Sequence, residues 1–180
     1  MTEEYLDILD ERGEKIGQQR SYIDAHKEGL IHKIAHVWIL NSKKELLIQK
    51  RSHARSANPD YWDISVAGHV SAGQTSLEAA QRETEEELGL VFPREAFKYL
   101  FTIEEHAVLN QGTYINNEFQ DVFLVRSDVT SSNIKLSDGE VAEVKWVSVE
   151  EFNTWIGKEE YKLVPHDEEH RRLLAHISEI

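Results

Sequence analysis

The feature that most constrains this chain is a glycine-containing loop followed, at a fixed distance, by an acidic helix. Gly68 opens the segment Gly-His-Val-Ser-Ala-Gly-Gln, and residues 82–90 read Arg-Glu-Thr-Glu-Glu-Glu-Leu-Gly-Leu. In an α-helix, side chains three and four positions apart share one face. Glu83, Glu86 and Glu87 would then crowd three carboxylates that repel one another unless a cation neutralises them. Oxygen ligands of this kind are typical of Mg²⁺ and Mn²⁺ sites.

The flanking residues predict where this helix begins and ends. Residues 75–78 read Thr-Ser-Leu-Glu, which has the form of a capping box, so the helix is expected to start near Thr75. Gly89 is well placed to end it. A stripe at helical spacing runs beside the acidic face and would anchor the helix to a core; it consists of Leu77, Ala80, Thr84 and Leu88.

The alternative is that an acidic run is merely a solvated surface. The chain offers two comparisons, Glu150-Glu151 and the run 167–172. The second run has basic residues three and four positions after its acids, and neither run follows a glycine loop. No Lys follows the glutamates of residues 83–87 at helical spacing, which favours a metal-binding role for them over a solvated face.

These residues resemble the signature of the Nudix hydrolases: a glycine, five residues, a glutamate, seven residues, and then Arg-Glu-apolar-x-Glu-Glu-x-Gly-apolar. The residues that match in register are Gly68, Arg82, Glu83, Glu86, Glu87, Gly89 and Leu90. Gln74 replaces the first glutamate, and Thr84 replaces an aliphatic residue. In the family, that first glutamate mostly braces the loop and the helix. Gln74 is therefore expected to keep a hydrogen bond, lose a charge and weaken activity without abolishing it.

Composition limits the other classes of function. The 180 residues are 40% hydrophobic and 29% charged, as in one compact globular domain. A net charge of −13 argues against a general grip on nucleic acid backbones. The absence of cysteine excludes disulfides, thiolate zinc sites and cysteine nucleophiles. No run of eighteen apolar residues exists and the N-terminus is acidic, so we expect no membrane span, no secretory signal and a cytoplasmic location.

Several strands and a few widely spaced helices predict an α/β fold with a mixed sheet. Strands are expected at residues 5–9, followed by a turn at 10–14, and at 36–40, 45–51, about 62–66, 98–108, 118–126 and 141–147; the second and third should form a hairpin. Further helices should begin near Ser148 and span 167–180. The resemblance, which covers roughly residues 32–155, implies a Nudix-type α/β/α sandwich. We expect a single domain, 1–180, with an N-terminal strand and hairpin extension (1–30), a core (32–155) and a C-terminal helical tail (156–180).

The resemblance implies a metal-dependent hydrolase that cleaves the diphosphate linkage of a nucleoside diphosphate derivative or another small organic diphosphate. Mg²⁺ or Mn²⁺ would be held by Gly68, Glu83, Glu86, Glu87 and Glu118. Arg82 would orient the glutamates, which with it form the expected catalytic set. The resemblance implies that one glutamate would act as the general base, and Glu104, Glu105 and Glu118 are further candidates for this role. The expected substrate-binding residues are Lys50, Arg51, Arg55 and His69, although surface basic residues are often only solvated.

The closest likeness within the superfamily is to the branch that contains isopentenyl-diphosphate isomerase. Segments 29–32, 61–69 and 116–118 resemble parts of that enzyme, including two metal-binding histidines at His32 and His69. The isomerase has a catalytic cysteine where this chain has Ala67, and no other cysteine replaces it, which disfavours isomerase activity. Considered alone, each histidine fits a structural role as well as a role in binding metal or phosphate.

A second alternative is a Nudix-like domain that binds a nucleotide or sugar diphosphate as a sensor, without hydrolysis. Gln74 is its sequence support, whereas the retained glutamate trio argues against it. The sequence specifies neither the physiological substrate nor the oligomeric state. A homodimer is compatible with the family, but no residue pattern here gives independent evidence of one.

Overall fold

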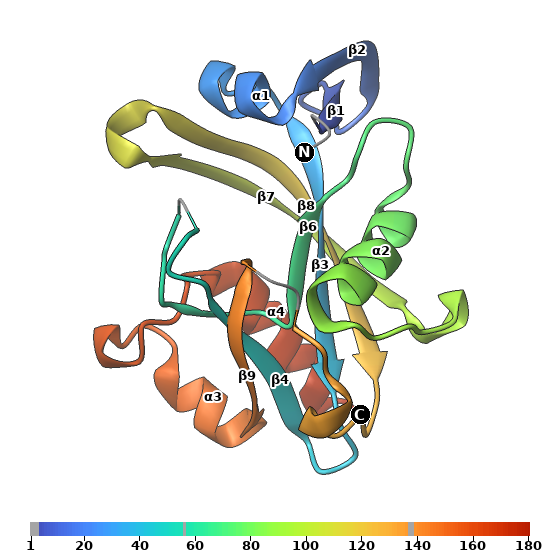
Figure 1. The fold of residues 1–180 in the computed structure, drawn as a ribbon, viewed down its shortest axis with the longest axis vertical. Helices are drawn as coiled ribbons and strands as arrows, with labels where there is room; N and C mark the ends of the chain where they lie inside the picture. The colour runs from blue at the N-terminus through green and yellow to red at the C-terminus, as the bar shows by residue number, and fades with distance from the viewer. Residues whose placement is uncertain (1–3, 56, 137–138) are drawn as a thin grey trace.

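The computed structural model describes residues 4–55, 57–136 and 139–180. Residues 1–3 of the predicted extension, Ser56 and residues 137–138 lie outside this description. The chain forms a seven-stranded mixed sheet, a separate two-stranded sheet and four α-helices (Figure 1). The prediction of an α/β fold built on a mixed sheet is confirmed.

The main sheet has the order β5-β4-β3-β8-β7, with β6 paired to β3 and β9 paired to β4. β3 and β8 run parallel, and the other pairs are antiparallel. The strands are β3 (His32–Leu40), β4 (Glu45–Arg51), β5 (Trp62–Asp63), β6 (Val66–His69), β7 (Lys98–Leu109), β8 (Tyr114–Arg126) and β9 (Val141–Ser148).

Helices cover both faces of the sheet, and the alternation of β3 explains how. Odd-numbered positions such as Val37 pack with α2 (Ser76–Leu88) in one core, which includes Ala80 and Leu88. Even-numbered positions such as Trp38 pack in a second core with α3 (Val149–Trp155) and α4 (Asp167–Ser178). Figure 1 shows α2 on one side of the sheet and α3 and α4 on the other. The predicted sandwich is therefore present.

The predicted N-terminal hairpin consists of β1 (Tyr5–Leu9) and β2 (Lys15–Ser21), which pair antiparallel. The sequence analysis missed the helix that follows, α1 (Tyr22–Glu28), which Ser21 caps by accepting a hydrogen bond from the Asp24 backbone N–H. In Figure 1 these elements lie above the main sheet, next to the long β7–β8 hairpin. The extension thus covers one end of the sheet.

Several predicted boundaries were wrong. The expected strand at 62–66 is two short strands, and Gly68 lies inside β6 rather than in a loop. β3 and β4 pair only near their turn, because β4 then pairs with β9 and β5 while β3 pairs with β6. β8 begins at Tyr114, four residues before the predicted start at 118. β4 and β6 therefore lie on the same side of β3 but pair with different parts of it, and they diverge from each other beside β3.

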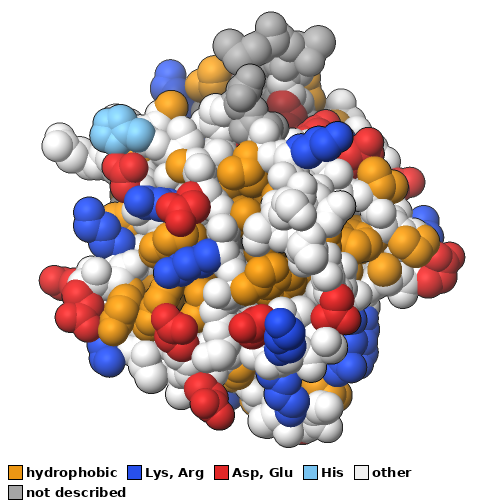
Figure 2. All heavy atoms as spheres, turned by 60° about the horizontal axis from the view of Figure 1, so that its bottom comes forward, with side chains coloured by type: hydrophobic (Ala, Val, Ile, Leu, Met, Phe, Trp, Pro, Cys, Tyr) orange, Lys and Arg blue, Asp and Glu red, His pale blue; other side chains and the backbone are white. Residues whose placement is uncertain are grey.

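The surface shows no general electrostatic pattern on the face drawn in Figure 2, where acidic and basic side chains are interspersed. Among the described residues, no helix has the length and apolar character needed to cross a membrane.

Candidate functional site

The acidic helix α2 begins and ends as the sequence predicts. Thr75 accepts a hydrogen bond from the Glu78 backbone N–H, and the Glu78 side chain accepts one from the Thr75 backbone N–H, which completes the capping box. Gly89 ends the helix in the left-handed conformation with φ +65°. Thr84, unusual at an apolar position, is fully buried and donates its hydroxyl to the Ala80 carbonyl at 2.6 Å. The hydroxyl is thus satisfied inside the core.

Gly68 and Glu83 are in closer contact than any other residue type at position 68 would allow. A Cβ atom at Gly68 would lie 2.0 Å from Cδ and 2.3 Å from Oε1 of Glu83. Since side chains alternate along a strand, Gly68 faces α2, whereas Ala67 and His69 face the other side of the sheet. β6 therefore presents the signature glycine and the adjacent histidine to opposite faces.

Two of the three signature glutamates are buried. Burial raises the pKa of Glu83 to about 7, although Arg82 opposes the rise. Burial, together with the charges of Glu83 and Glu140, raises the pKa of Glu87 well above its usual range. Glu87 accepts a hydrogen bond from Gln49 Nε2 at 3.1 Å, while Glu86 is exposed. Buried carboxyl groups that resist ionisation in this way are ready to exchange their protons for a cation.

Arg82 contacts Glu83 and Glu86, two of the three glutamates that it was expected to orient. Its Nη1 lies 2.7 Å from Glu83 Oε1 and 2.9 Å from Glu86 Oε2. Its Nη2 donates to the His69 carbonyl at 2.9 Å and to Gln74 Oε1 at 3.4 Å. Arg82 therefore ties α2 to β6 and to the loop, and Gln74 keeps the hydrogen bond predicted for it.

Because Gln74 already contacts Arg82, Gln74→Glu is expected to have a small effect. The new carboxylate would add a partly buried ion pair worth about 1 kcal/mol or less. We expect kcat to change by less than about threefold, since the Gln74 side chain contacts Arg82 and is not one of the expected metal or substrate ligands. Urea unfolding and steady-state kinetics test this. A gain in kcat of tenfold or more would instead show that the native glutamine impairs the site.

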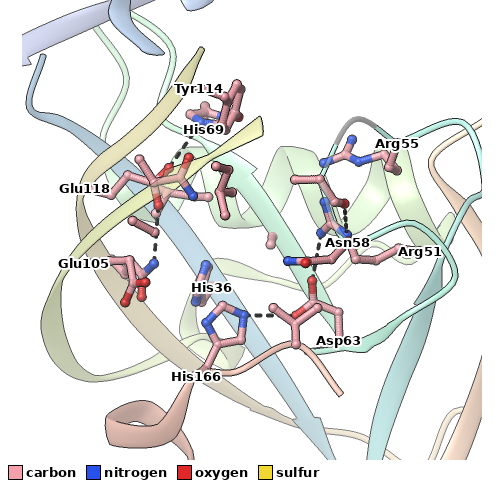
Figure 3. Close-up of a pocket in the computed structure, with 18 of the residues that line it drawn as sticks. His36, Arg51, Arg55, Asn58, Asp63, His69, Glu105, Tyr114, Glu118 and His166 are labelled. Atoms are coloured by element: carbon pink, nitrogen blue, oxygen red, sulfur yellow. Dashed lines mark hydrogen bonds and ion pairs between the residues drawn. The ribbon is translucent and has the colours of Figure 1, made fainter. Parts of the chain in front are cut away.

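The opposite face of β6 lines a pocket formed by β3–β8 and the segment before α4, with a volume of about 180 Å³ (Figure 3). This volume far exceeds the ~10–15 Å³ that one water requires. In Figure 3, His69, Tyr114 and Glu118 lie at one end, Arg51, Arg55 and Asn58 at another, and His36, Asp63 and His166 along the floor. The pocket thus combines an acidic and imidazole-rich end with a cationic end.

At the first end, His69 and Glu118 belong to a buried cluster of three histidines around Glu118. From Glu118 Oε1, the Nε2 atoms of His26, His32 and His69 lie at 3.8, 3.5 and 3.8 Å. Among the described residues, these four side chains form the set whose possible ligand atoms all lie within 4.8 Å of one another. Glu83, Glu86 and Glu87 do not join it. Glu118 was expected to act with those glutamates, and the structure places it with the histidines instead.

The orientation of the histidines fits a metal ion. Nδ1 of His26 donates to the Tyr22 carbonyl, and Nδ1 of His32 donates to the Leu30 carbonyl, each at 2.8 Å. A carbonyl only accepts, so Nδ1 carries a proton in each ring and Nε2 is the atom that faces Glu118. Burial and the nearby histidines lower the pKa of His69 to about 3, so this ring is neutral. All three Nε2 atoms are buried without a hydrogen-bond partner.

The spacing of the cluster supports the same conclusion. Donor atoms bound at about 2.0–2.2 Å to one tetrahedral ion lie about 3.3–3.6 Å apart, close to the 3.5–3.8 Å between Glu118 Oε1 and the three Nε2 atoms. Asn116 Oδ1, on the same face of β8, is a further buried acceptor without a partner. Imidazole ligands favour Zn²⁺ and other transition ions, whereas the carboxylates of α2 suit Mg²⁺ or Mn²⁺.

Two tyrosines close the cluster from the outside. Tyr114, at the start of β8, stacks on His26 with ring centroids 4.3 Å apart. Its hydroxyl lies 2.6 Å from that of Tyr22 in α1. These contacts hold α1 and β8 together over the three histidines.

Three of the four expected substrate-binding residues line the pocket, and one does not. His69, Arg51 and Arg55 line the pocket, whereas Lys50 lies outside it with its ammonium 6.0 Å from the centre of the Trp62 ring. Arg51 is paired with buried Asp63 at 2.8 Å, so part of its charge is already neutralised. Arg55 pairs with Glu140 at 2.7 Å.

Asp63 also binds His166, whose Nε2 lies 3.1 Å away. Burial alone would lower the pKa of His166, but the hydrogen bond and charge of Asp63 outweigh it and raise the pKa to about 9. Since the folded-state value exceeds the ordinary 6.5, this group stabilises the fold fully below pH 6.5. The contribution is lost as the pH rises through about 9.

We therefore expect His166→Gln to flatten the decline of stability across this window. The difference in free energy of unfolding between wild type and variant should shrink by about 1–3 kcal/mol from pH 6 to pH 9.5. Urea unfolding in the presence of a chelator measures it. Parallel pH curves for the two proteins would refute the assignment of a charged His166.

The sequence analysis missed several buried residues that contact the pocket lining. His26 belongs to an extension that the resemblance does not cover, and its only local signal is the Ser21 cap of a short helix. The run 167–172 was treated as solvated. Its Glu168–Arg171 pair is indeed exposed, but Glu169 and His170 are buried, with 1% exposure each, so that expectation was wrong for both.

The NUDIX domain family model matches residues 30–175 of this chain. "Nudix hydrolase 3" of Arabidopsis thaliana is 43% identical over 170 residues, which are 93% of this chain and 22% of that protein. The chain thus spans about a fifth of this relative. "Isopentenyl-diphosphate Delta-isomerase" of Escherichia coli is 28% identical over 147 residues, covering 81% of this chain and 78% of the isomerase.

Among solved structures, the crystal structure of DR0079 from Deinococcus radiodurans has a TM-score of 0.69 and 25% sequence identity. The match covers 96% of this chain and 98% of that one. The similarity therefore extends over nearly the whole length of both chains.

Proposed function

Because the chain belongs to the NUDIX domain family, we propose that it is a metal-dependent hydrolase that cleaves the diphosphate linkage of a nucleoside diphosphate derivative or another small organic diphosphate. The observation that carries the proposal is the pocket that runs from the His₃Glu cluster, whose His69 and Glu118 line it, to two arginines across β6 from the signature helix. Such a pocket offers separate positions for a metal and for an anionic group.

Several residues have distinct roles in this proposal. Gly68, Glu83, Glu86 and Glu87 hold Mg²⁺ or Mn²⁺, and His26, His32, His69 and Glu118 hold a second divalent ion. Bound metal supplies charge neutralisation at the phosphoryl oxygens and lowers the pKa of a coordinated water. Arg82 fixes the glutamates, and Arg51 and Arg55 bind the outer phosphate. Lys50 is left without a role at this pocket.

Ala67 supports hydrolysis over isomerisation of a prenyl diphosphate. It lies on the pocket face of β6, and an alanine methyl group cannot exchange a proton with an alkene. The domain limits 1–180, the cytoplasmic location and a homodimer stay predictions. A non-catalytic sensor is the remaining alternative, because the same pocket would bind a diphosphate without turnover.

A substrate panel tests the proposal. Phosphate and monophosphate release should be measured from nucleoside di- and triphosphates, sugar nucleotides and prenyl diphosphates, with Mg²⁺, Mn²⁺ or Zn²⁺, for wild type and Glu86→Gln. We expect metal-dependent turnover of at least one class and its loss in the variant. Tight binding without turnover would favour the sensor, and formation of dimethylallyl diphosphate would restore the isomerase alternative.

A further inference from the structure

One buried histidine on the pocket floor belongs to neither the His₃Glu cluster nor the cationic end. His36 lies on β3, with its side chain on the same face as His32, and it is 2% exposed. The next position on that face is Trp38, which is fully buried in the core. His36 is thus the last polar side chain of β3 before the core begins.

A carboxylate from the C-terminal helix holds this imidazole. Glu169, in the first turn of α4, accepts from His36 Nδ1 at 2.8 Å and from Trp38 Nε1 at 2.6 Å. Burial alone would raise the pKa of Glu169, but the His36 contact and the charge of His166 lower it to about 2. Glu169 therefore accepts from both groups, and the proton that His36 donates to it resides on Nδ1.

The other ring nitrogen of His36 is the one available to a ligand. None of the described residues makes a hydrogen bond to its Nε2, and that atom does not belong to the buried, unpartnered nitrogens of the site. It therefore keeps contact with the open space of the pocket. His166 differs, because Asp63 takes its Nε2 and its Nδ1 is buried.

The neighbours of His36 leave room beside it. Ala67 is its partner across the β3–β6 ladder and offers only a methyl group. His69 is paired with Ile34, which lies two residues before His36 on the same face of β3. Two residues along a strand correspond to about 6–7 Å, so His69 lies about that far along the strand from the level of His36. The pocket has a volume of about 180 Å³ and is lined by His36, Ala67 and His69, so it has space for a water hydrogen-bonded to His36 at about 3 Å.

We propose that His36 is a catalytic residue of this pocket, a general base that takes a proton from the attacking water, and that Glu169 is its positioning residue. The inference rests on the proposed hydrolase function. The water oxygen forms a bond to phosphorus, and the bridging P–O bond breaks with its electron pair going to the leaving group. The water proton passes to Nε2 and then to solvent. Glu169 keeps Nδ1 protonated throughout.

The experiment uses the full chain and a substrate that the panel identifies. His36→Ala should lower kcat by about 10²–10³-fold with KM changed by less than about threefold, and added imidazole should restore at least tenfold of the loss. Glu169→Gln should lower kcat by at least tenfold. His53→Ala, which removes an exposed histidine paired with Asp60, is the matched control and should leave kcat unchanged.

Near-UV circular dichroism identifies variants that fail to fold. His36→Gln keeps an N–H donor for Glu169 and replaces the alanine variant if that one unfolds; as a folded protein it should show the same loss of kcat. If folded His36→Ala or His36→Gln keeps kcat within threefold of wild type, or if imidazole restores nothing, the base assignment is wrong while the hydrolase proposal stands. If wild type turns over no member of the panel, both fail.

Discussion

Glutamine in place of Glu87 is expected to make the protein more stable and nearly inactive. Glu87 is 3% exposed, and burial together with Glu83 and Glu140 raises its pKa well above the ordinary value. A carboxyl group with a raised folded-state pKa destabilises the fold as the pH rises above its ordinary value of 4.5, because the unfolded chain then loses a proton that the folded chain retains. The amide removes that charge and keeps the shape, so we expect a gain of about 1–2 kcal/mol at pH 8 without metal.

The same substitution removes a metal ligand in the proposed mechanism. We expect kcat to fall by about 10²–10³-fold, the cost of losing one charged group at a transition state. Steady-state kinetics and urea unfolding with and without Mn²⁺ measure both effects. Glu85→Gln is the control, because Glu85 is exposed on the same helix and outside the signature set. Equal activity of the Glu87 and Glu85 variants would remove Glu87 from the catalytic machinery.

A methyl group at position 68 should be nearly as damaging, through geometry rather than charge. In Gly68→Ala the new Cβ would lie 2.0–2.3 Å from three atoms of Glu83, which is buried and held by Arg82. The glutamate must leave its position, so we expect a loss of about 1–3 kcal/mol in stability and at least about 10²-fold in kcat.

A double-mutant cycle isolates this contact. Glu83→Ala removes the atoms that the methyl group would meet, so Gly68→Ala should cost much less stability in that background. Unfolding free energies of the four proteins give the coupling energy directly. Additive costs would mean that the glycine is required for some reason other than the approach of Glu83.

The signature helix could be predicted because its signals are local. Thr75, Glu78 and Gly89 specify its ends through contacts within a few residues, and the acidic spacing lies on the helix itself. The strand of Gly68 was misread as a loop because the pairing that makes it a strand comes from β3, more than thirty residues earlier. Local patterns do not encode such a partner.

The pocket was only partly predictable for the same physical reason. Glu118 was placed in the site, but its partner His26 precedes it by 92 residues on an unpredicted helix. Glu169 sits in a run of charges that resembles solvated surface. Its burial follows from His36 and Trp38, which lie 133 and 131 residues away and which no helical periodicity can indicate. Composition and spacing predict which functional side chains share one helix or strand. They do not predict which helices and strands contact one another in the fold.

The position of His26 also bears on how relatives of this chain are sorted. The match to the family model begins at residue 30, so it includes the signature glycine and glutamates but not α1. A fragment cut at residue 30 would keep every signature residue, yet it would lack His26 of the cluster and Tyr22, one of the two tyrosines that cover it. Two proteins with identical signatures can therefore differ in whether they form this histidine cluster, according to the residues that precede the matched domain.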